Sequence, residues 1–382
     1  MWVSQLALTD IRSYSQVEVD LQPGVTTFVG RNGQGKTNLV EAIGYVATLN
    51  SHRVASDTPL VKFGTDQGFI RCSVNANDRD TLVEIAILPG RANKARINRS
   101  PTPRMRDVLG ILRVVIFAPE DLSLVKGDPS DRRKFLDDLL VQRIPRLAGT
   151  RQDLDRILKQ RNALLKSART NRKSSDEYLD STLSVWNDQL ATVGAELLAA
   201  RQVLLAELSP PAVANYTFIS EDPTAELALT YVSNMSQVLG DAVPIGSPDK
   251  EEWRLALLDA MKLRRKDEVD RGLTLVGPQR DDLHISLGPV PAKGYASHGE
   301  SWSIALALKL ASFDVLRSDG EDPVLILDDV FAELDTKRRE RLAARLTEAT
   351  QVLITAAVDA DIPAELLGSR FWVDAGKVSH DH

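Results

Sequence analysis

The sequence VTTFVGRNGQGKTNLVEAIGYVATL, residues 25–49, places a strand, a glycine-rich loop and a helix in succession. Residues 25–29 are all β-branched or aromatic, which is typical of a buried strand. From Leu39 onward apolar residues recur every three or four positions, which indicates a helix. Between them the chain fits the pattern G-x-x-x-x-G-K-[ST] with Gly30, Arg31, Asn32, Gly33, Gln34, Gly35, Lys36 and Thr37.

This order of elements predicts a phosphate-binding P-loop. Glycines let backbone N–H groups curl around an anion, and the helix N-terminus adds positive partial charge. In such a loop Lys36 reaches the β- and γ-phosphates, and the Thr37 hydroxyl ligates Mg²⁺. The alternative is a chance match, which the flanking strand and helix make rare. The stretch therefore predicts a nucleoside triphosphate site.

A second stretch, PVLILDDVFAELD at residues 323–335, predicts the other half of that site. Four consecutive apolar residues indicate a buried parallel strand. Asp328 and Asp329 follow at its carboxyl end, where ligands bind in open α/β sheets. We expect Asp328 to hold the Mg²⁺ that Thr37 also ligates, and Asp329 to orient or activate the attacking water. The alternative is that both acids are solvated or cap the next helix.

The composition bounds the kind of protein. At 382 residues the chain exceeds one ordinary domain, so we expect two domains or lobes. The single cysteine, Cys72, excludes internal disulfides and fits a reducing cytoplasm. The N-terminus lacks signal-peptide features, and no apolar run approaches the roughly 20 residues of a membrane span. The net charge of −6 argues against a wholly basic surface but allows a local basic face.

Strands dominate the prediction for the N-terminal part of the chain. Alternating or continuous apolar patterns indicate strands at 2–8, 16–21, 68–74, 81–88 and 114–117. Residues 91–106 contain six Arg or Lys and no acid. They form either a solvated loop or a surface for the phosphates of a polyanion. In the second case the candidate DNA contacts are Arg96, Arg99 and Arg104.

Residues 127–271 predict a mainly helical lobe. Apolar residues at 154–168 and 179–204 repeat in a heptad seam, so two helices should pack antiparallel as a short coiled-coil arm. Asp131 is a candidate N-cap for the helix before the arm. We expect Pro210 and Pro211 to end the arm, with strands at 216–219 and 227–231 and a helix at 251–271 after it.

The arm is also basic on its first helix. Between Gln142 and Lys173 there are ten Arg or Lys against two Asp. This excess is either the solvated face of a coiled helix or a contact for nucleic acid.

A small polar loop, SHGES at residues 297–301, precedes a predicted helix, and residues 274–288 before it indicate strand, turn and strand. A Ser/Gly loop at a helix N-terminus can receive an anion, although many helices begin this way. The position shortly before the Asp-Asp strand gives the loop its significance.

Together these motifs resemble the ABC-type ATPase head of SMC proteins, a mixed α/β fold. Only a short arm fits between Thr37 and Ser297, whereas SMC proteins carry hundreds of coiled-coil residues there. Four motifs make the whole chain similar to the RecF family of bacterial recombination mediators: PEDLSLVKGDPSDRRKFLD (119–137), GPQRDDL (277–283), SHGES (297–301) and DDVFAELD (328–335).

The resemblance implies an ATPase head assembled from residues 1–126 and 272–382, with a helical arm lobe at 127–271. It implies a cytoplasmic, nucleoid-associated protein whose two subunits sandwich ATP and bind double-stranded DNA at gaps. With RecR and RecO, such a dimer directs RecA loading, and slow hydrolysis dissolves it.

The resemblance also implies residue roles. Ser297, Gly299 and Glu300 form a signature turn, in which Ser297 and Gly299 contact the γ-phosphate held by the other subunit. Asp335 lies beside it at the dimer interface.

The chain departs from related patterns at several positions. Glu300 stands where many relatives have Gln, which puts like charge near a phosphate, and Gln279 replaces a His. Strand 352–355 is followed by Ala356 rather than by the switch histidine of transporter ATPases. Asp329 is one methylene shorter than the Glu of those proteins. The last two departures predict a sluggish ATPase, which suits a switch.

Two other classes are the alternatives. An SMC-like structural DNA clamp would need a far longer arm. A transporter-type ATPase subunit would carry an LSGGQ-like signature and the switch histidine, and this sequence has neither.

Overall fold

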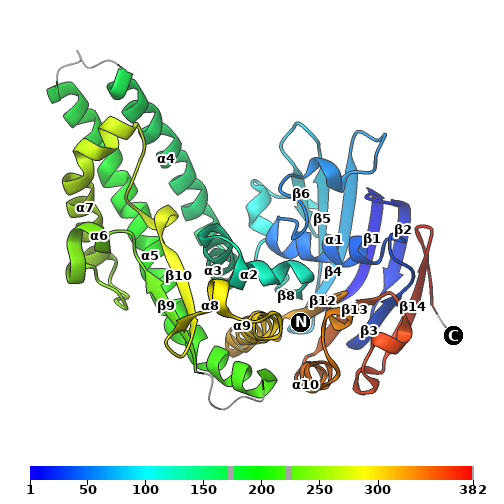
Figure 1. Ribbon diagram of the computed structural model, residues 1–382. Coiled ribbons are helices and arrows are strands. Elements are labelled where there is room, and N and C mark those ends of the chain that lie inside the picture. Colours follow the sequence, from blue (N-terminus) through cyan, green and yellow to red (C-terminus); the bar gives the residue numbers. More distant parts are fainter. Residues whose placement is uncertain (171–175, 221–225, 381–382) are drawn as a thin grey trace.

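The computed structural model describes residues 1–170, 176–220 and 226–380. Two six-stranded sheets lie side by side with helix α1, and an assembly of long helices extends away from them (Figure 1). A three-stranded sheet belongs to the helical part. The predicted mixed α/β architecture is confirmed.

The first sheet is antiparallel throughout and is built from residues 2–101. In spatial order it consists of β2 (Tyr14–Asp20), β1 (Trp2–Ile11), β4 (Gly68–Ala76), β5 (Arg79–Ile87), β6 (Lys94–Ile97) and β7 (Ser100–Pro101). The predicted strands of this region are confirmed. The basic stretch 91–106 is not simply a loop, because β6 and β7 extend the edge of the sheet.

The second sheet combines both ends of the chain. Its order is β15 (Lys377–His380), β14 (Ser369–Asp374), β3 (Gly24–Val29), β13 (Gln351–Ala356), β12 (Val324–Asp328) and β8 (Val114–Phe117). All pairs from β14 to β8 are parallel, and β15 is antiparallel at the edge. The apolar run of β12 is buried along its whole length, as predicted.

Helix α1 (Lys36–Thr48) shares one core with both sheets. Its Leu39, Ile43 and Val46 are buried in the cluster that contains Leu6 of β1 and Phe28 of β3. The burial recurs at the three- and four-residue spacing seen in the sequence. The core therefore fixes α1 and the glycine loop before it against the sheets.

The helical part contains the predicted antiparallel pair. Helix α4 (Leu147–Thr170) and α5 (Asp176–Ser220) run in opposite directions, since Thr150 contacts Glu196 and Arg161 contacts Asn187. The other helices are α2 (Ser123–Lys126), α3 (Pro129–Arg143), α6 (Ser236–Leu239), α7 (Lys250–Arg271), α8 (Ala292–Tyr295), α9 (His298–Ser318) and α10 (Thr336–Leu346). The three-stranded sheet has the order β11 (Val290–Pro291), β10 (Asp282–Leu287) and β9 (Leu227–Val232).

The prediction that Pro210 and Pro211 end the arm was wrong. Helix α5 continues through them to Ser220. Its last part buries Ala212, Tyr216 and Ile219 at helical spacing in the main core. Burial of this face offsets the backbone hydrogen bonds that the prolines cannot donate. The strand predicted at 216–219 is consequently helix, whereas the strand predicted at 227–231 is present as β9.

Two smaller predictions were also wrong. The N-cap of α3 is Asp128, and Asp131 is the third helical residue, whose carboxylate accepts the Asp128 N–H at 2.9 Å. Pro129 at the first helical position explains the earlier start, because its fixed φ suits that site. Residues 274–277 form no strand, and β10 pairs with β9 instead.

Candidate functional site

The glycine loop between β3 and α1 is anchored at both ends and exposed at its tip. A Cβ on Gly30 would lie 2.2 Å from the Val373 carbonyl oxygen, and one on Gly35 would lie 2.8 Å from the Tyr14 hydroxyl. Gly35 also has φ +114° and accepts a hydrogen bond from buried Tyr14 at 3.1 Å. Since Arg31, Asn32 and Gly33 are exposed, the backbone N–H groups of the tip can face an anion.

Lys36 begins α1 and is almost completely buried. Its Nζ lies 3.4 Å from the Arg31 carbonyl and 3.4 Å from Asn32 Oδ1. Both contacts exceed the usual hydrogen-bond length, so the loop holds the ammonium group loosely. A phosphate oxygen within the loop would be a stronger partner.

Asp328, at the end of β12, lies beside α1. Its Oδ1 accepts the Thr37 hydroxyl at 2.8 Å and the Thr355 hydroxyl at 2.7 Å. Its Oδ2 lies 3.5 Å from His52 Nε2. Burial favours the neutral acid, but the contacts with His52, Thr355 and Thr37 outweigh it and lower the pKa of Asp328. The carboxylate is therefore ionised and oriented toward Thr37.

Asp329 follows in a left-handed backbone conformation, with φ +52°. Its N–H donates to the Thr355 hydroxyl at 2.9 Å, which fixes the turn. Burial raises the pKa of Asp329, and the nearby Lys36 ammonium only partly counteracts this. The positive φ turns the second acid away from the strand direction, so the two neighbouring carboxylates face different surroundings.

The oxygen donors fit the divalent cation predicted for this place. Thr37 and Asp328 offer a hydroxyl and a carboxylate, which are ligands that Mg²⁺ prefers. Among the described residues, no group of three His, Cys, Asp or Glu side chains could hold a metal ion alone. A site of this kind suits an ion that completes its coordination with phosphate oxygens and water.

Sequence reasoning missed a second polar network at this site. Glu41 of α1 is buried and accepts two hydrogen bonds from Arg12, at 2.9 and 2.6 Å, and one from Ser51 at 2.5 Å. Arg53 lies 3.6 Å from the same carboxylate. This network fixes the segment that carries His52. No motif marks these residues, because they come from a turn, a helix and a loop.

The signature turn forms the N-terminus of α9. The Ser297 hydroxyl accepts the Glu300 N–H at 3.2 Å, and Glu300 Oε2 accepts the Ser297 N–H at 2.7 Å. This is a capping box, in which Glu and Gln are equivalent. Glu300 therefore has a local structural role. Gly299 is half-buried, Ser297 is exposed, and Asp335 is the exposed N-cap of α10.

The structure separates the two basic regions. Arg96, Arg99 and Arg104 are exposed on or beside the β6–β7 edge. On and beside α4, ion pairs with carboxylates neutralise Arg143, Arg146, Arg151, Arg156 and Arg161. Of the other basic residues in that stretch, Lys159, Lys166 and Arg169 are exposed, while Arg172 and Lys173 lie outside the described residues. Most of the described basic residues of this stretch thus form ion pairs within the protein.

The motifs around residues 119–137 and 277–283 meet in the helical lobe, away from the glycine loop. Arg132 binds Asp282 through two hydrogen bonds, at 2.7 and 2.8 Å. Buried Arg201 does the same with Asp137, at 2.8 and 3.0 Å, and also donates to the Pro278 carbonyl. Two of the four motifs thus build a polar core that joins α3, α5 and the segment before β10.

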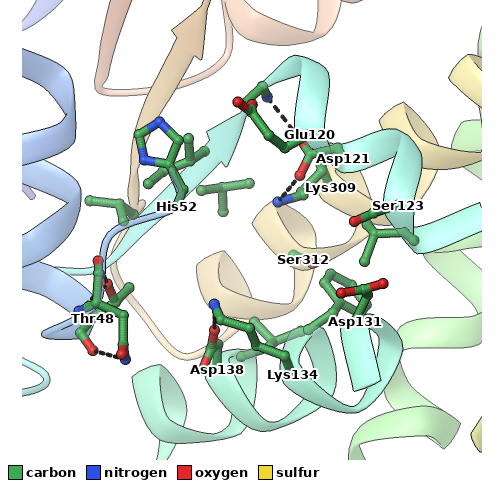
Figure 2. Close-up of a pocket in the computed structure, with 18 of the residues that line it drawn as sticks. Thr48, His52, Glu120, Asp121, Ser123, Asp131, Lys134, Asp138, Lys309 and Ser312 are labelled. Atoms are coloured by element: carbon green, nitrogen blue, oxygen red, sulfur yellow. Dashed lines mark hydrogen bonds and ion pairs between the residues drawn. The ribbon is translucent and has the colours of Figure 1, made fainter. Parts of the chain in front are cut away.

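A cavity of about 250 Å³ lies between the end of α1, β8, α3 and α9. Figure 2 shows Thr48 and His52 on one side and Asp131 and Lys134 on another, with Lys309 pointing toward Asp121 at 2.8 Å. Its lining residues include His52 but none of residues 30–37. The cavity is therefore distinct from the glycine loop, although His52, which lines it, also lies 3.5 Å from Asp328.

The chain is similar to known proteins over nearly its whole length. The family described as RecF/RecN/SMC N terminal domain matches residues 2–362. A relative from Streptomyces avermitilis, called DNA replication and repair protein RecF, is 55% identical over 379 residues, and the match covers 99% of each chain. A relative of the same name from Kineococcus radiotolerans is 56% identical and covers 96% of each chain.

Solved structures agree with this relationship. The recombination mediator protein RecF with ATP, described as part of the RecFOR pathway, matches with a TM-score of 0.86 at 26% identity, over 99% of each chain. The Smc head domain of Pyrococcus furiosus matches with a TM-score of 0.55 at 17% identity, over 100% of this chain and 96% of that one. The predicted fold, an ABC-type ATPase head with a short coiled-coil arm, is confirmed. In the described ranges no helix is both long and apolar enough to span a membrane.

Proposed function

The chain belongs to the RecF family, and from this premise we propose that it is an ATP-dependent DNA-binding switch in DNA replication and recombinational repair. The observation that carries the proposal is the 2.8 Å contact between Thr37 and Asp328 beside an exposed, anchored glycine loop. Residues 30–37 would bind the triphosphate of ATP, with Lys36 toward its β- and γ-phosphates. Thr37 and Asp328 would hold Mg²⁺, which supplies charge neutralisation at the phosphates.

We propose a slow hydrolysis reaction. Lys36 and Asp329 are its catalytic candidates, with Asp329 positioned to orient the attacking water. Burial raises the pKa of Asp329 and so disfavours its charged form in the monomer. Buried β13 ends at Ala356 and is followed by Ala357, so the chain lacks a histidine at that sensor position. Both features favour a switch over a motor.

The dimer is the second part of the proposal. Ser297, Gly299 and Glu300 would act on the nucleotide of a second subunit, with Asp335 beside it at the interface. This is supported by the exposure of Ser297 and Asp335 at two neighbouring helix N-termini. ATP binding would then join the subunits, and hydrolysis would release them.

The proposed ligand of the dimer is double-stranded DNA at single-strand gaps. Arg96, Arg99 and Arg104 are the candidate phosphate contacts, because all three are exposed, whereas half of the basic residues of α4 (Arg151, Arg156 and Arg161) are ion-paired. RecR and RecO are the proposed partners in loading RecA, and the proposed location is the cytoplasm, at the nucleoid. The 24-residue length of α4 argues against a long-armed structural clamp.

The division into a head (1–126 and 272–382) and an arm lobe (127–271) also remains a proposal. The second sheet supports it, since that sheet draws on both chain ends. The pairing of β10 with β9 ties residues 282–287 to the arm lobe and suggests a later boundary on that side.

Light scattering and gel shifts test the switch. The protein and its Lys36→Met variant are compared with ATP, ADP or no nucleotide, on duplex, single-stranded and gapped DNA. We expect ATP to shift the protein to a dimer that binds duplex and gapped DNA, and the variant to stay monomeric. Lys62→Met is the matched control, since Lys62 lies outside the loop and contacts Ser13 and Ser15. A Lys36→Met protein that dimerises and binds DNA like the parent would refute the proposal.

A further inference from the structure

One arginine joins the signature turn of α9 to the turn that carries Asp335. Arg338, in the first turn of α10, forms an ion pair with Asp335 through Nη1. Its Nε donates to Ser303 Oγ of α9 at 2.9 Å, and Ser303 is fully buried. A single guanidinium group therefore connects the Asp335 turn to the helix that begins with the signature turn.

The same side chain lies against the glycine of the signature turn. A Cβ on residue 299 would lie 2.9 Å from Arg338 Nη2 and 3.3 Å from its Cζ. Gly299 has no positive φ, so the backbone conformation itself does not demand glycine. The guanidinium group packs directly against the backbone of the turn, and a larger residue here would displace it.

We infer that Arg338 is a positioning residue for the half-site that a second subunit uses. It holds residues 297–299 and Asp335 as one preformed surface. The inference rests on the proposed function, because it assumes that this surface acts on the nucleotide of another copy. Arg338 lies outside the four motifs, and it would act on the nucleotide of the other subunit and not on that of its own.

The chemistry of the group suits this role. A guanidinium ion stays protonated and offers donors in a rigid plane, so it can bind Asp335 and Ser303 together. The N–H groups of His298 and Gly299 are in the first turn of α9, where no preceding helical carbonyl can accept them. The positive charge of Arg338 offsets one of the two carboxylates of this surface, Asp335 and Glu300. The N–H groups of the α9 N-terminus are then the donors that can accept a polyphosphate.

Arg338 is not required to hold α9 and α10 together. Leu342 and Leu346 already anchor α10 in the main core. Arg345 makes a comparable bridge, since its Nη2 donates to Asp314 of α9 at 2.7 Å. That bridge lies two helical turns farther along α10. Arg345→Ala is therefore a matched control, because it also removes an α10–α9 arginine contact but leaves the signature turn intact.

Mixed subunits test the direction of action. Arg338→Ala should reduce ATP hydrolysis about 10- to 100-fold, the range found when partners that orient metal ligands are removed. Lys36→Met protein is inactive alone but carries an intact half-site. Adding it in excess to the Arg338→Ala protein should restore hydrolysis, because the glycine loop of one meets the signature turn of the other. Adding the double variant Lys36→Met/Arg338→Ala should restore nothing.

Each outcome has one meaning. If Arg338 serves its own subunit's nucleotide, the Lys36→Met protein will not rescue the activity, and the inference fails. It also fails if Arg345→Ala loses as much activity as Arg338→Ala, or if Arg338→Ala hydrolyses ATP normally. Failure of the proposed function shows differently, since the unsubstituted protein itself would then neither dimerise nor hydrolyse ATP. Should Arg338→Ala not fold, judged by its melting temperature, Arg338→Lys carries the test, because it keeps the charge and loses the planar fork.

Discussion

Thr37 and Asp328 share a hydrogen bond of 2.8 Å although they lie 291 residues apart in the chain. The bond brings the helix after the glycine loop to the end of β12. It also orients the hydroxyl and the carboxylate that are proposed to ligate Mg²⁺. The two residues meet because β3, β13 and β12 are neighbouring parallel strands, whose carboxyl ends lie at the same edge of the sheet.

Replacing Thr37 by Ala should weaken nucleotide binding only when Mg²⁺ is present. The hydroxyl ligand is lost and Asp328 loses a partner, so we expect at least a tenfold lower affinity, the smaller end of the losses at metal sites. Titration with a fluorescent ATP analogue measures this with Mg²⁺ and with EDTA. Thr37→Ser keeps the hydroxyl and should bind normally. An equal loss in EDTA would show that Thr37 does not act through the ion.

Replacing Asp137 by Ala should destabilise the helical lobe without abolishing the nucleotide site. It leaves the buried Arg201 guanidinium without its carboxylate, which typically costs about 3–5 kcal/mol. Chemical denaturation measures the free energy of unfolding. Arg156→Ala, which breaks an exposed pair with Asp153, should cost no more than about 1 kcal/mol. Similar losses in both variants would contradict a structural role for the buried pair.

Asp281 gives a prediction for pH. Burial raises its pKa despite hydrogen bonds from Asn234, Tyr231 and Ser233. The folded state therefore binds a proton more readily than the unfolded state does. The contribution of Asp281 to stability falls as the pH rises above the ordinary pKa of an Asp carboxyl. Asp281→Asn cannot titrate and loses one acceptor, at a cost of about 1–3 kcal/mol. Its deficit in melting temperature should shrink from pH 4 to pH 8. A deficit in melting temperature that grows with pH would contradict a raised pKa of Asp281.

The two basic regions can be distinguished by salt. Each phosphate contact contributes about 0.9 to the slope of log affinity against log salt. Changing Arg96, Arg99 and Arg104 together to Ala should lower that slope by roughly 2.7 on duplex DNA. The matched variant changes Lys159, Lys166 and Arg169, and so removes the same charge from the arm. If only the arm variant changes the slope, the β6–β7 edge is not the DNA contact.

Glu300 gives a prediction within its capping box. Glu300→Ala removes the acceptor of the Ser297 N–H and should cost about 1 kcal/mol of stability. Glu300→Gln retains the box and should change stability by less than about 0.5 kcal/mol. Thermal unfolding separates the two. Equal destabilisation by Gln and Ala would mean that the negative charge, and not the cap, is what matters.

The sequence was sufficient where a motif and its structural context are local. The strand, loop and helix at 25–49 form as predicted, because one apolar pattern sets both the strand and the buried face of α1. The strand of Asp328 was equally clear, since continuous burial requires a continuous apolar run. These two stretches also supply the residues of the proposed nucleotide site.

The sequence was insufficient where tertiary packing decides. Pro210 and Pro211 stop an isolated helix, but the buried face of α5 continues past them. Arg338 and His52 carry no local signal, because their partners lie in other elements. Residues 119–137 and 277–283 marked the family resemblance, but the sequence did not show that their Arg and Asp side chains form the polar core of a lobe.

The neighbours of β3 in its sheet, β13 and β14, are among the last strands of the chain. A ribosome adds about 5–20 residues per second, so the completed loop waits on the order of 20–60 s for them. The first sheet needs only residues 2–101 and can form meanwhile. A chain released early thus has the glycine loop but not the sheet that fixes it. Truncated products of this gene should therefore be inert and should not act as partly functional competitors of the finished protein.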